Sequence, residues 1–272
     1  MKSFNKKNIS KFAKNLRKNI LKMSLSAGAA SSHFGGALSC IDIIAVLFNN
    51  VINFNSKNFK KQSRDRFILS KGHACLSLYS VLKEIDIISE KEILTFEKSN
   101  SFLLGHPVKN FDKGIELSTG SLGMGLSISM GIALGLKKNK LKSKVYTIIG
   151  DGECNEGAIW EVALSAPKFN LNNFCVIIDR NNFQQTGLGT EILNLNPLKD
   201  KWKSFNWDVI EIDGHDYLDI FNSLIKPSTK PKIIIAKTIK GKGFSFSENN
   251  NDWHHKVLTK NQYEEGIREL DQ

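Results

Sequence analysis

The sequence predicts one α/β domain, built on a parallel sheet with helices on both faces. Three observations support this prediction: apolar segments of strand length, amphipathic segments between them, and the lack of a Pro-, Gly- or Ser-rich linker within 1–272. Short, uniformly apolar strands that alternate with helices are typical of a parallel sheet covered on both sides. A chain of 272 residues with 41% hydrophobic content can bury one large core.

The first third of the chain is predicted to begin with helices. Apolar residues recur at helical spacing over about 8–24, a loop of small residues follows at 26–39, and "CIDIIAVLF" (40–48) predicts a further helix. Next, "DRFIL" (65–69) predicts a short strand that leads through a Ser-Lys-Gly-His turn into a helix over 74–84. The small-residue loop is a place where the backbone can approach a ligand closely.

From residue 143 onward the pattern alternates regularly. Apolar strands are predicted within 144–150, 173–180 and 230–238, and helices within 157–169 and 216–226. A helix of this length can return the chain to a parallel neighbouring strand. This part of the chain therefore carries most of the predicted sheet.

The apolar segment "SLGMGLSISMGIALGL" (121–136) is shorter than a membrane span and rich in Gly and Ser. We expect a buried helix that a neighbour approaches closely, across a subunit interface. The basic start of the chain lacks the apolar core of a signal peptide, and the four cysteines show no C-x-x-C spacing. The sequence therefore predicts a protein of the reducing cytoplasm with no membrane segment, zinc site or disulfide framework.

The net charge of +11 raises the question of a nucleic-acid partner. Of the 38 basic residues, 33 are lysines, and they are spread along the chain without a basic block interleaved with aromatic residues. Nucleic-acid binding is therefore not expected, because it draws on clustered charge and stacking.

Residues 148–157 read "IIGDGECNEG", so a predicted strand ends in an acidic turn. Asp151 and Asn181 each fall just past the end of a predicted strand, and in a parallel sheet such ends share one edge. A carboxylate, an amide oxygen and a backbone carbonyl suit Mg²⁺ that also binds phosphate oxygens. Gly150 and Gly152 would let backbone amides meet a diphosphate. We therefore expect Asp151 to hold a divalent metal that clamps a diphosphate.

A lone Gly-Asp-Gly is more often a tight turn in which the aspartate, here Asp151, caps the following helix. The order strand, Gly-Asp-Gly, helix, strand and "DRNN" favours the metal instead. This order resembles that of thiamine diphosphate enzymes, in which Asn-Asn or a close variant follows the Gly-Asp-Gly.

Beyond this motif, residues 8–258 resemble the amino-terminal, diphosphate-binding region of transketolases. The matching motifs are "SSHFGGALSCIDIIAVLF", "RDRFILSKGHA", "GHP", "GIELSTGSLGMGLS", "EIDGHD" and "KTIKGKGFSF". The resemblance implies active-site roles for His33, His73 and His106 and a cofactor loop with Gly120, Ser121 and Leu122. Ser121 departs from the pattern, because long transketolases usually have Pro there.

The last active-site histidine of the family follows the Gly-Lys-Gly loop, where "DWHHKV" offers His254 or His255. The Trp-His pair favours His254. Any one histidine in a Gly-rich loop can simply bond backbone carbonyls. Four in separate motifs suit a polyhydroxylated, phosphorylated substrate, because neutral imidazoles donate, accept and move protons. His215, in the Asp-Gly-His-Asp turn, is expected to be structural.

The resemblance also implies a ligand set for the metal: Asp151, Asn181 and the backbone carbonyl of Phe183 would hold Mg²⁺, with Ca²⁺ as the alternative. Asp151 and Asn181 would also belong to the thiamine diphosphate site, together with His73, Gly152 and His254.

Three charged residues near these motifs have open roles. Glu156 would orient cofactor-binding groups, report to a second active site, or only favour a helix N-terminus. Lys71 and Lys242 could attract a substrate phosphate, but among so many lysines a solvated surface position is expected.

In this family a two-carbon ketol unit moves from a ketose to an aldose phosphate, and His33, His73, His106 and His254 would handle hydroxyls and protons. The family also uses a glutamate from a pyrimidine-binding domain, for which no motif appears here. The resemblance therefore implies the amino-terminal subunit of a split transketolase. A second subunit would carry the pyrimidine-binding and carboxyl-terminal domains, in a dimer of heterodimers.

Two other functions remain open. The chain could belong to another split thiamine diphosphate enzyme, of the keto acid dehydrogenase or deoxyxylulose phosphate synthase type. It could also bind the cofactor without catalysis, although holding a cofactor does not need a set of sugar-binding histidines.

Overall fold

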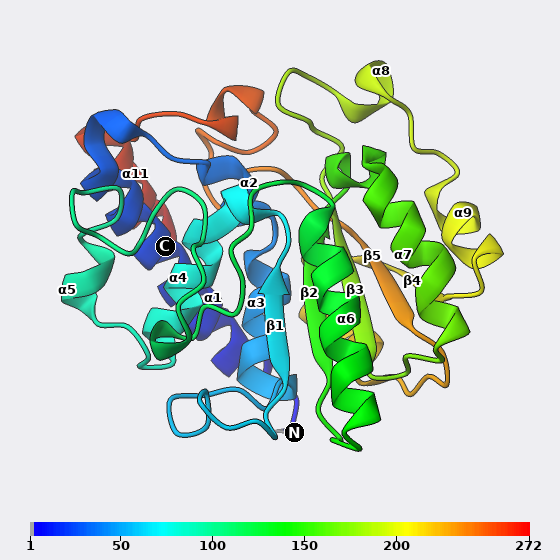
Figure 1. Cartoon of the computed structure of the whole chain (residues 1–272). Coiled ribbons are helices and arrows are strands. Elements are labelled where there is room, and N and C mark those ends of the chain that lie inside the picture. Colours follow the sequence, from blue (N-terminus) through cyan, green and yellow to red (C-terminus); the bar gives the residue numbers. More distant parts are fainter. Residues whose placement is uncertain (1–2) are drawn as a thin grey trace.

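The computed structural model describes residues 3–272 as a five-stranded parallel sheet with helices on both faces (Figure 1). The strand order is β1-β2-β3-β5-β4. The strands are β1 Arg66–Leu69, β2 Val145–Gly150, β3 Phe174–Arg180, β4 Asp208–Asp213 and β5 Lys232–Lys237. The longer helices are α1 Lys6–Ala27, α4 Cys75–Glu84, α6 Met124–Lys138, α7 Gly157–Lys168, α10 Tyr217–Ile225 and α11 Lys260–Asp271. The short helices are α2 Phe34–Ser39, α3 Ile41–Val46, α5 Glu90–Ile93, α8 Gly189–Ile192 and α9 Leu198–Ser204.

Two apolar cores lie on opposite faces of the sheet, because successive strand side chains point to opposite sides. In β2, Tyr146 and Ile148 join the core shared with α1, α3, α4 and α10, whereas Val145 and Ile149 join the core shared with α6, α7 and α9. Both cores are lined by buried strand residues, which explains why the strand segments read as uniformly apolar.

The predicted α/β class and parallel sheet are confirmed, with differences at the sheet edge and in the small-residue loop. β4 was not predicted, because it lies at the edge and is half-buried along most of its length, so its sequence mixes polar and apolar residues. α2 occupies part of the expected loop at 26–39. A Cβ on Gly35 would lie 2.9 Å from the Trp253 carbonyl oxygen, so close packing rather than helix propensity accounts for this helix.

The predicted helix at 121–136 is present as α6, but it is only half buried. Leu126 and Ala133 face the core, whereas Met124 and Ile128 are 50% and 39% exposed. Within residues 3–272 no helix is long and apolar enough to cross a membrane.

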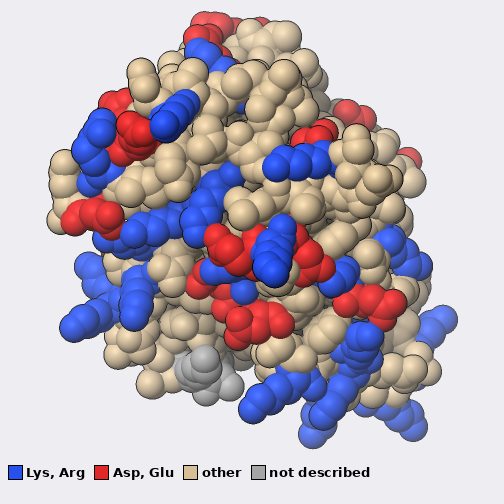
Figure 2. Space-filling view, turned by 90° about the vertical axis from the view of Figure 1, so that its left-hand side faces the viewer, with Lys and Arg blue, Asp and Glu red and all other residues tan. Residues whose placement is uncertain are grey.

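Charges of both signs are interleaved on the side of the molecule where α1, α5 and α11 lie, and further Lys or Arg side chains project at the lower right (Figure 2). Lys22 of α1 pairs with Glu90 of α5, and Lys18 of α1 pairs with Asp271 of α11. Part of the positive charge on this face is therefore locally compensated.

Candidate active site

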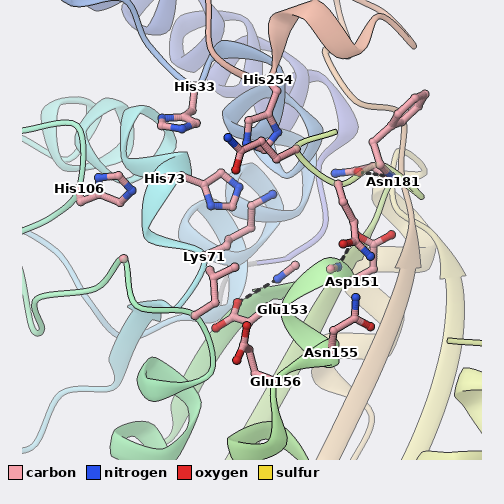
Figure 3. Close-up of a pocket in the computed structure, with 17 residues that line it drawn as sticks. His33, Lys71, His73, His106, Asp151, Glu153, Asn155, Glu156, Asn181 and His254 are labelled. Carbon is pink, nitrogen blue, oxygen red and sulfur yellow. Dashed lines mark hydrogen bonds between the residues drawn. The ribbon is translucent and has the colours of Figure 1, made fainter. Parts of the chain in front are cut away.

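One cavity of about 360 Å³ lies where β1, β2 and β3 end (Figure 3). Its position follows the rule that ligands bind beyond the carboxyl ends of parallel strands. Eleven of the twelve predicted site residues line it: His33, His73, His106, Gly120, Leu122, Asp151, Gly152, Glu156, Asn181, Phe183 and His254. The twelfth, Ser121, is exposed and does not line it.

Residues 150–156 and 179–183, at the ends of β2 and β3, form what we call the strand-end half of the cavity. The parallel ladder pairs Gly150 with Asp179, so the residues that follow each strand lie side by side. Asp151 Oδ2 accepts a hydrogen bond of 2.7 Å from the Asn182 backbone N–H, which ties the two turns together.

The strand-end half has the donor set for a hard cation: the Asp151 carboxylate, the Asn181 amide oxygen and the Phe183 carbonyl. Burial, together with the nearby Asp179 carboxylate, raises the pKa of Asp151 to about 6. A cation would favour the ionised form of this carboxylate. Within residues 3–272 no group of three or more His, Cys, Asp or Glu side chains forms a metal site, so this mixed set is the candidate.

Two amide side chains that line the cavity have polar atoms without a partner, and a polar ligand could bind them. Asn155 Oδ1 and Gln184 Nε2 are both buried at the cavity and have no hydrogen-bond partner. Buried polar atoms are usually paired, so a ligand with acceptors, donors or bound water fits here. The residues present are therefore compatible with a diphosphate and its metal.

Glu153 was not predicted as a site residue, yet it joins three segments beneath the cavity. Its carboxylate is 2% exposed and accepts from the Ser70 hydroxyl at 2.5 Å and from the backbone N–H groups of Gly123 at 2.9 Å and Gly150 at 3.2 Å. Burial raises the pKa of Glu153. This carboxylate fixes the acidic turn against the end of β1 and the loop before α6.

The expectation that Lys71 lies on the solvated surface is wrong. Lys71 is 1% exposed, and its Nζ donates to Asp179 Oδ2 at 2.5 Å and to the Gly36 carbonyl at 3.0 Å. Burial alone would lower the pKa of Lys71, but Asp179 outweighs it and raises the pKa. Lys242 is about one-third exposed and pairs with Glu248, which agrees with a surface position.

Close backbone packing brings the loop with Gly120 to the cavity. A Cβ on Gly72 would lie 2.5 Å from the Thr119 carbonyl carbon, so the Ser-Lys-Gly-His turn can contact this loop only with glycine. Gly120 has φ +150°, and a Cβ there would lie 2.9 Å from the His106 ring.

The other wall, which we call the histidine half, consists of His33, His73, His106 and His254. The His33 ring lies at its centre, with ring centroids 5.4 Å from His73, 5.6 Å from His106 and 5.3 Å from His254. Burial first, and neighbouring histidines next, lower the pKa of His33 to about 3. Burial also lowers the pKa of His73 well below its usual value. These two rings are therefore neutral near pH 7 and can both donate and accept.

Lys240 sets the orientation of His254. It is 1% exposed, and its Nζ lies 3.0 Å from His254 Nδ1 and 2.5 Å from Asn251 Oδ1. Burial lowers the pKa of Lys240 to about 8, which leaves it largely protonated at pH 7. An ammonium group only donates, so Nδ1 accepts and His254 Nε2 carries the proton. Burial and Lys240 lower the pKa of His254 to about 4.

The two histidines of "DWHHKV" have different positions. His254 lines the cavity, whereas His255 is exposed and contacts His33 in a tilted arrangement with ring centroids 4.4 Å apart. An antiparallel bridge between Ser32 and Lys256 places His33 opposite His255. His215 does not line this cavity.

Most of the chain, and not the site alone, is similar to known proteins. Residues 10–270 match the family model described as "Transketolase, thiamine diphosphate binding domain". The chain is 40% identical to one of the subunits of apulose-4-phosphate transketolase from Phocaeicola vulgatus, over 89% of this chain and 87% of that protein. It is 37% identical to the SqwG subunit of 6-deoxy-6-sulfo-D-fructose transketolase from Clostridium sp., over 88% of each chain.

A solved structure gives the same likeness. The chain superimposes on transketolase from Campylobacter jejuni with a TM-score of 0.91 and 31% sequence identity. The match covers 98% of this chain but 43% of that one. The chain therefore spans less than half of that transketolase and nearly the whole of the two subunits named above.

Proposed function

The chain belongs to the transketolase family, and from this premise we propose that residues 1–272 form one thiamine diphosphate-binding domain that transfers two-carbon ketol units with a separate subunit. The observation that carries the proposal is the cavity itself. It combines a donor set for a cation with a wall of four imidazoles, of which His33, His73 and His254 are partly buried and neutral near pH 7.

In the strand-end half, Asp151, Asn181 and the Phe183 carbonyl hold Mg²⁺, with Ca²⁺ as the alternative. The remaining cofactor contacts come from His73, Gly120, Leu122, Gly152, Glu156 and His254, all of which line the cavity. When bound, thiamine diphosphate supplies the nucleophilic carbon and the electron sink for breaking and forming a carbon–carbon bond. The chain's own residues bind and orient it.

In the histidine half, the imidazoles position sugar hydroxyls and move protons. His254 presents Nε2–H to the cavity, because Lys240 occupies Nδ1. This group donates a hydrogen bond to a substrate oxygen and stabilises negative charge that develops there. His33, His73 and His106 share this work, since their rings surround the same space.

A partner subunit completes the site on the side of α6 and α7. Met124, Ile128 and Leu164 on these helices are 50%, 39% and 68% exposed. A Cβ on Gly131 or Gly135 of α6 would meet nothing within 4 Å, so this face is open to a close neighbour. The partner carries the pyrimidine-binding and carboxyl-terminal domains, and two such pairs form a dimer of heterodimers.

The relatives point to anionic sugars as substrates. Their names specify apulose 4-phosphate in one case and 6-deoxy-6-sulfo-D-fructose in the other, each with one anionic group. A sugar phosphate fits the cavity in the same way, because its neutral imidazoles can donate hydrogen bonds to hydroxyl and phosphate oxygens. The four cysteines are free and buried, which fits a reducing cytoplasm.

The direct test is ketol transfer from xylulose 5-phosphate to ribose 5-phosphate with thiamine diphosphate and Mg²⁺, and apulose 4-phosphate as a second sugar. The chain is assayed alone and with a candidate partner from the same genome. Transfer only in the mixture supports the proposal. Consumption of pyruvate without sugar transfer would favour another thiamine diphosphate enzyme, and cofactor binding without any turnover would favour a binding protein.

A further inference from the structure

A second buried polar cluster lies outside the cavity, and we call it the Asp42 cluster: Arg17, Asp42, His215 and Tyr217. Asp42 Oδ2 accepts from Arg17 Nη2 at 2.8 Å and from His215 Nδ1 at 2.8 Å, and Asp42 Oδ1 accepts from the Tyr217 hydroxyl at 3.3 Å. Burial alone would raise the pKa of Asp42, but Arg17 and His215 lower it to about 2. The carboxylate is therefore ionised and fully engaged.

The two hydrogen-bond partners of His215 select one tautomer of its ring. The Ile239 backbone N–H donates to His215 Nε2 at 2.9 Å, so Nε2 has no proton. Nδ1 then carries the proton that is donated to Asp42. The ring thus connects a buried carboxylate to the backbone that follows β5, and its contacts reach well beyond its own turn.

Arg17 holds the same backbone segment at its other end. Its Nε donates to the Lys242 carbonyl at 3.3 Å. Gly243 has φ +109°, and a Cβ there would lie 2.5 Å from Arg17 Nε, so the guanidinium packs directly against the chain. The segment 239–243 is therefore fixed at Ile239 and at Lys242, with Lys240 between the two anchors.

Lys240 transmits this constraint to the cavity. Its ammonium group contacts His254 Nδ1 and lies 5.5 Å from the centroid of the Phe183 ring. A displaced 239–243 segment would move the ammonium group away from Nδ1, and His254 would lose the contact that keeps its proton on Nε2. The 239–243 segment thus connects the Asp42 cluster to His254, a predicted catalytic histidine.

We infer that His215, held by Asp42 and Arg17, is a positioning residue that sets Lys240 and through it the orientation of His254. The consequence for ketol transfer rests on the proposed function, whereas the effect on Lys240 does not. A second buried ion pair provides a matched control. Arg64 and Glu116 are 5% and 9% exposed and do not line the cavity.

The experiment compares His215→Leu, His215→Gln and the control Glu116→Gln in the full chain. The readout is the rate at which an amine-reactive reagent modifies Lys240 at fixed pH, followed by peptide mass spectrometry. His215→Leu removes both hydrogen bonds of the ring and is expected to speed modification by about tenfold. His215→Gln is expected to restore most of the protection, because an amide offers both a donor and an acceptor.

Glu116→Gln is expected to lower stability while the modification rate of Lys240 stays within about twofold of the wild-type rate. Unchanged modification in His215→Leu, or an equal rise in Glu116→Gln, would overturn the inference. If His215→Leu does not fold, Asp42→Asn is used in its place with the same expectation, because it keeps the side-chain size.

Ketol transfer by the two-subunit enzyme is measured in parallel. His215→Leu is expected to lower kcat more than it raises KM, with recovery in His215→Gln. If Lys240 responds as expected but the wild-type enzyme transfers no ketol unit, the proposed function fails and the positioning role stands. If transfer is normal in His215→Leu and Lys240 stays protected, the positioning role fails alone.

Discussion

The two halves of the cavity are built in opposite ways. The strand-end half comes from two neighbouring strands, and the backbone pairing of β2 with β3 sets the positions of its residues. The histidine half gathers loops as distant in the chain as His33 and His254 around one space. Burial favours the uncharged form of the side chains in both halves. It therefore raises the pKa of Asp151 and lowers the pKa of His33. The comparison indicates that one half is preset for a cation and the other for a neutral substrate group.

Asp151→Asn is expected to have the largest effect, because it removes the only carboxylate of the proposed ligand set. Loss of a residue that only supports a metal ligand costs about 10–100-fold in metal affinity. Loss of a ligand itself should therefore lower the affinity for the cofactor with Mg²⁺ by at least about 100-fold. Titration calorimetry of the two-subunit enzyme measures it. His33→Asn is the control from the histidine half and should retain cofactor binding while transfer falls. Equal losses of affinity in both variants would contradict the division into two halves.

His254→Ala tests the histidine half directly. Removing one positioned hydrogen-bond donor to a developing negative charge costs about 10²–10³-fold, so kcat/KM should fall within that range. Steady-state kinetics with a sugar phosphate donor measures the loss. His255→Ala, one residue along and on the exposed rim, should cost less than the lower end of the range. A larger loss in His255→Ala than in His254→Ala would exchange their roles.

Glu153→Gln tests the scaffold beneath the strand-end half. The amide nitrogen would face donors that now bond a carboxylate, so the free energy of unfolding should fall by about 1–3 kcal/mol. Urea denaturation measures it. Glu156→Gln, in the same turn but exposed, should change the free energy of unfolding by less than about 0.5 kcal/mol. The prediction is wrong if the exposed substitution costs as much as the buried one.

The pH dependence of the ligand-free chain should have opposite signs in the two halves. The folded-state pKa values of His33 and His254, about 3 and about 4, lie below the ordinary 6.5, so the unfolded chain binds more protons between these values. The free energy of unfolding therefore falls as pH drops below 6.5. For Asp151, raised from 3.8 to about 6, this free energy falls as pH rises through that interval.

Replacing both His33 and His254 by Asn should therefore reduce the loss of unfolding free energy below pH 6.5. The reduction should be about 1 kcal/mol for each histidine, a value that allows for solvent screening. Asp151→Asn should make the free energy of unfolding fall more steeply as the pH drops. Urea midpoints measured from about pH 4 to about pH 7 distinguish the two variants, because this range covers most of the interval between the folded and ordinary pKa values. Slopes that change in the same direction in both variants would contradict the opposite signs.

The sequence predicted the parts of the fold and site that depend on local pattern. The strands at β2, β3 and β5 are uniformly apolar because they are buried on both faces, and Asp151 is recognisable because it directly follows one of them. The edge strand β4 was missed because half-buried positions do not give an apolar run.

The rest depended on contacts between distant segments. A lysine in a lysine-rich chain carries no sign of burial, so the positions of Lys71 and Lys240 followed only once Asp179 and Asn251 were placed beside them. Glu153 was likewise indistinguishable from its acidic neighbours until Ser70 and the glycine N–H groups surrounded it.

The bridge between Ser32 and Lys256 has a consequence for folding order. The neighbouring pair Ser31 and His255 is separated by 224 positions, so this contact closes nearly the whole chain into a loop. Contacts of such separation form late, after local strand pairing has reduced the entropy of closure. During synthesis, β2 and β3 can pair long before residue 256 leaves the ribosome. The strand-end half is then expected to exist on the nascent chain before the histidine half, which is complete only after residue 256 has been synthesised.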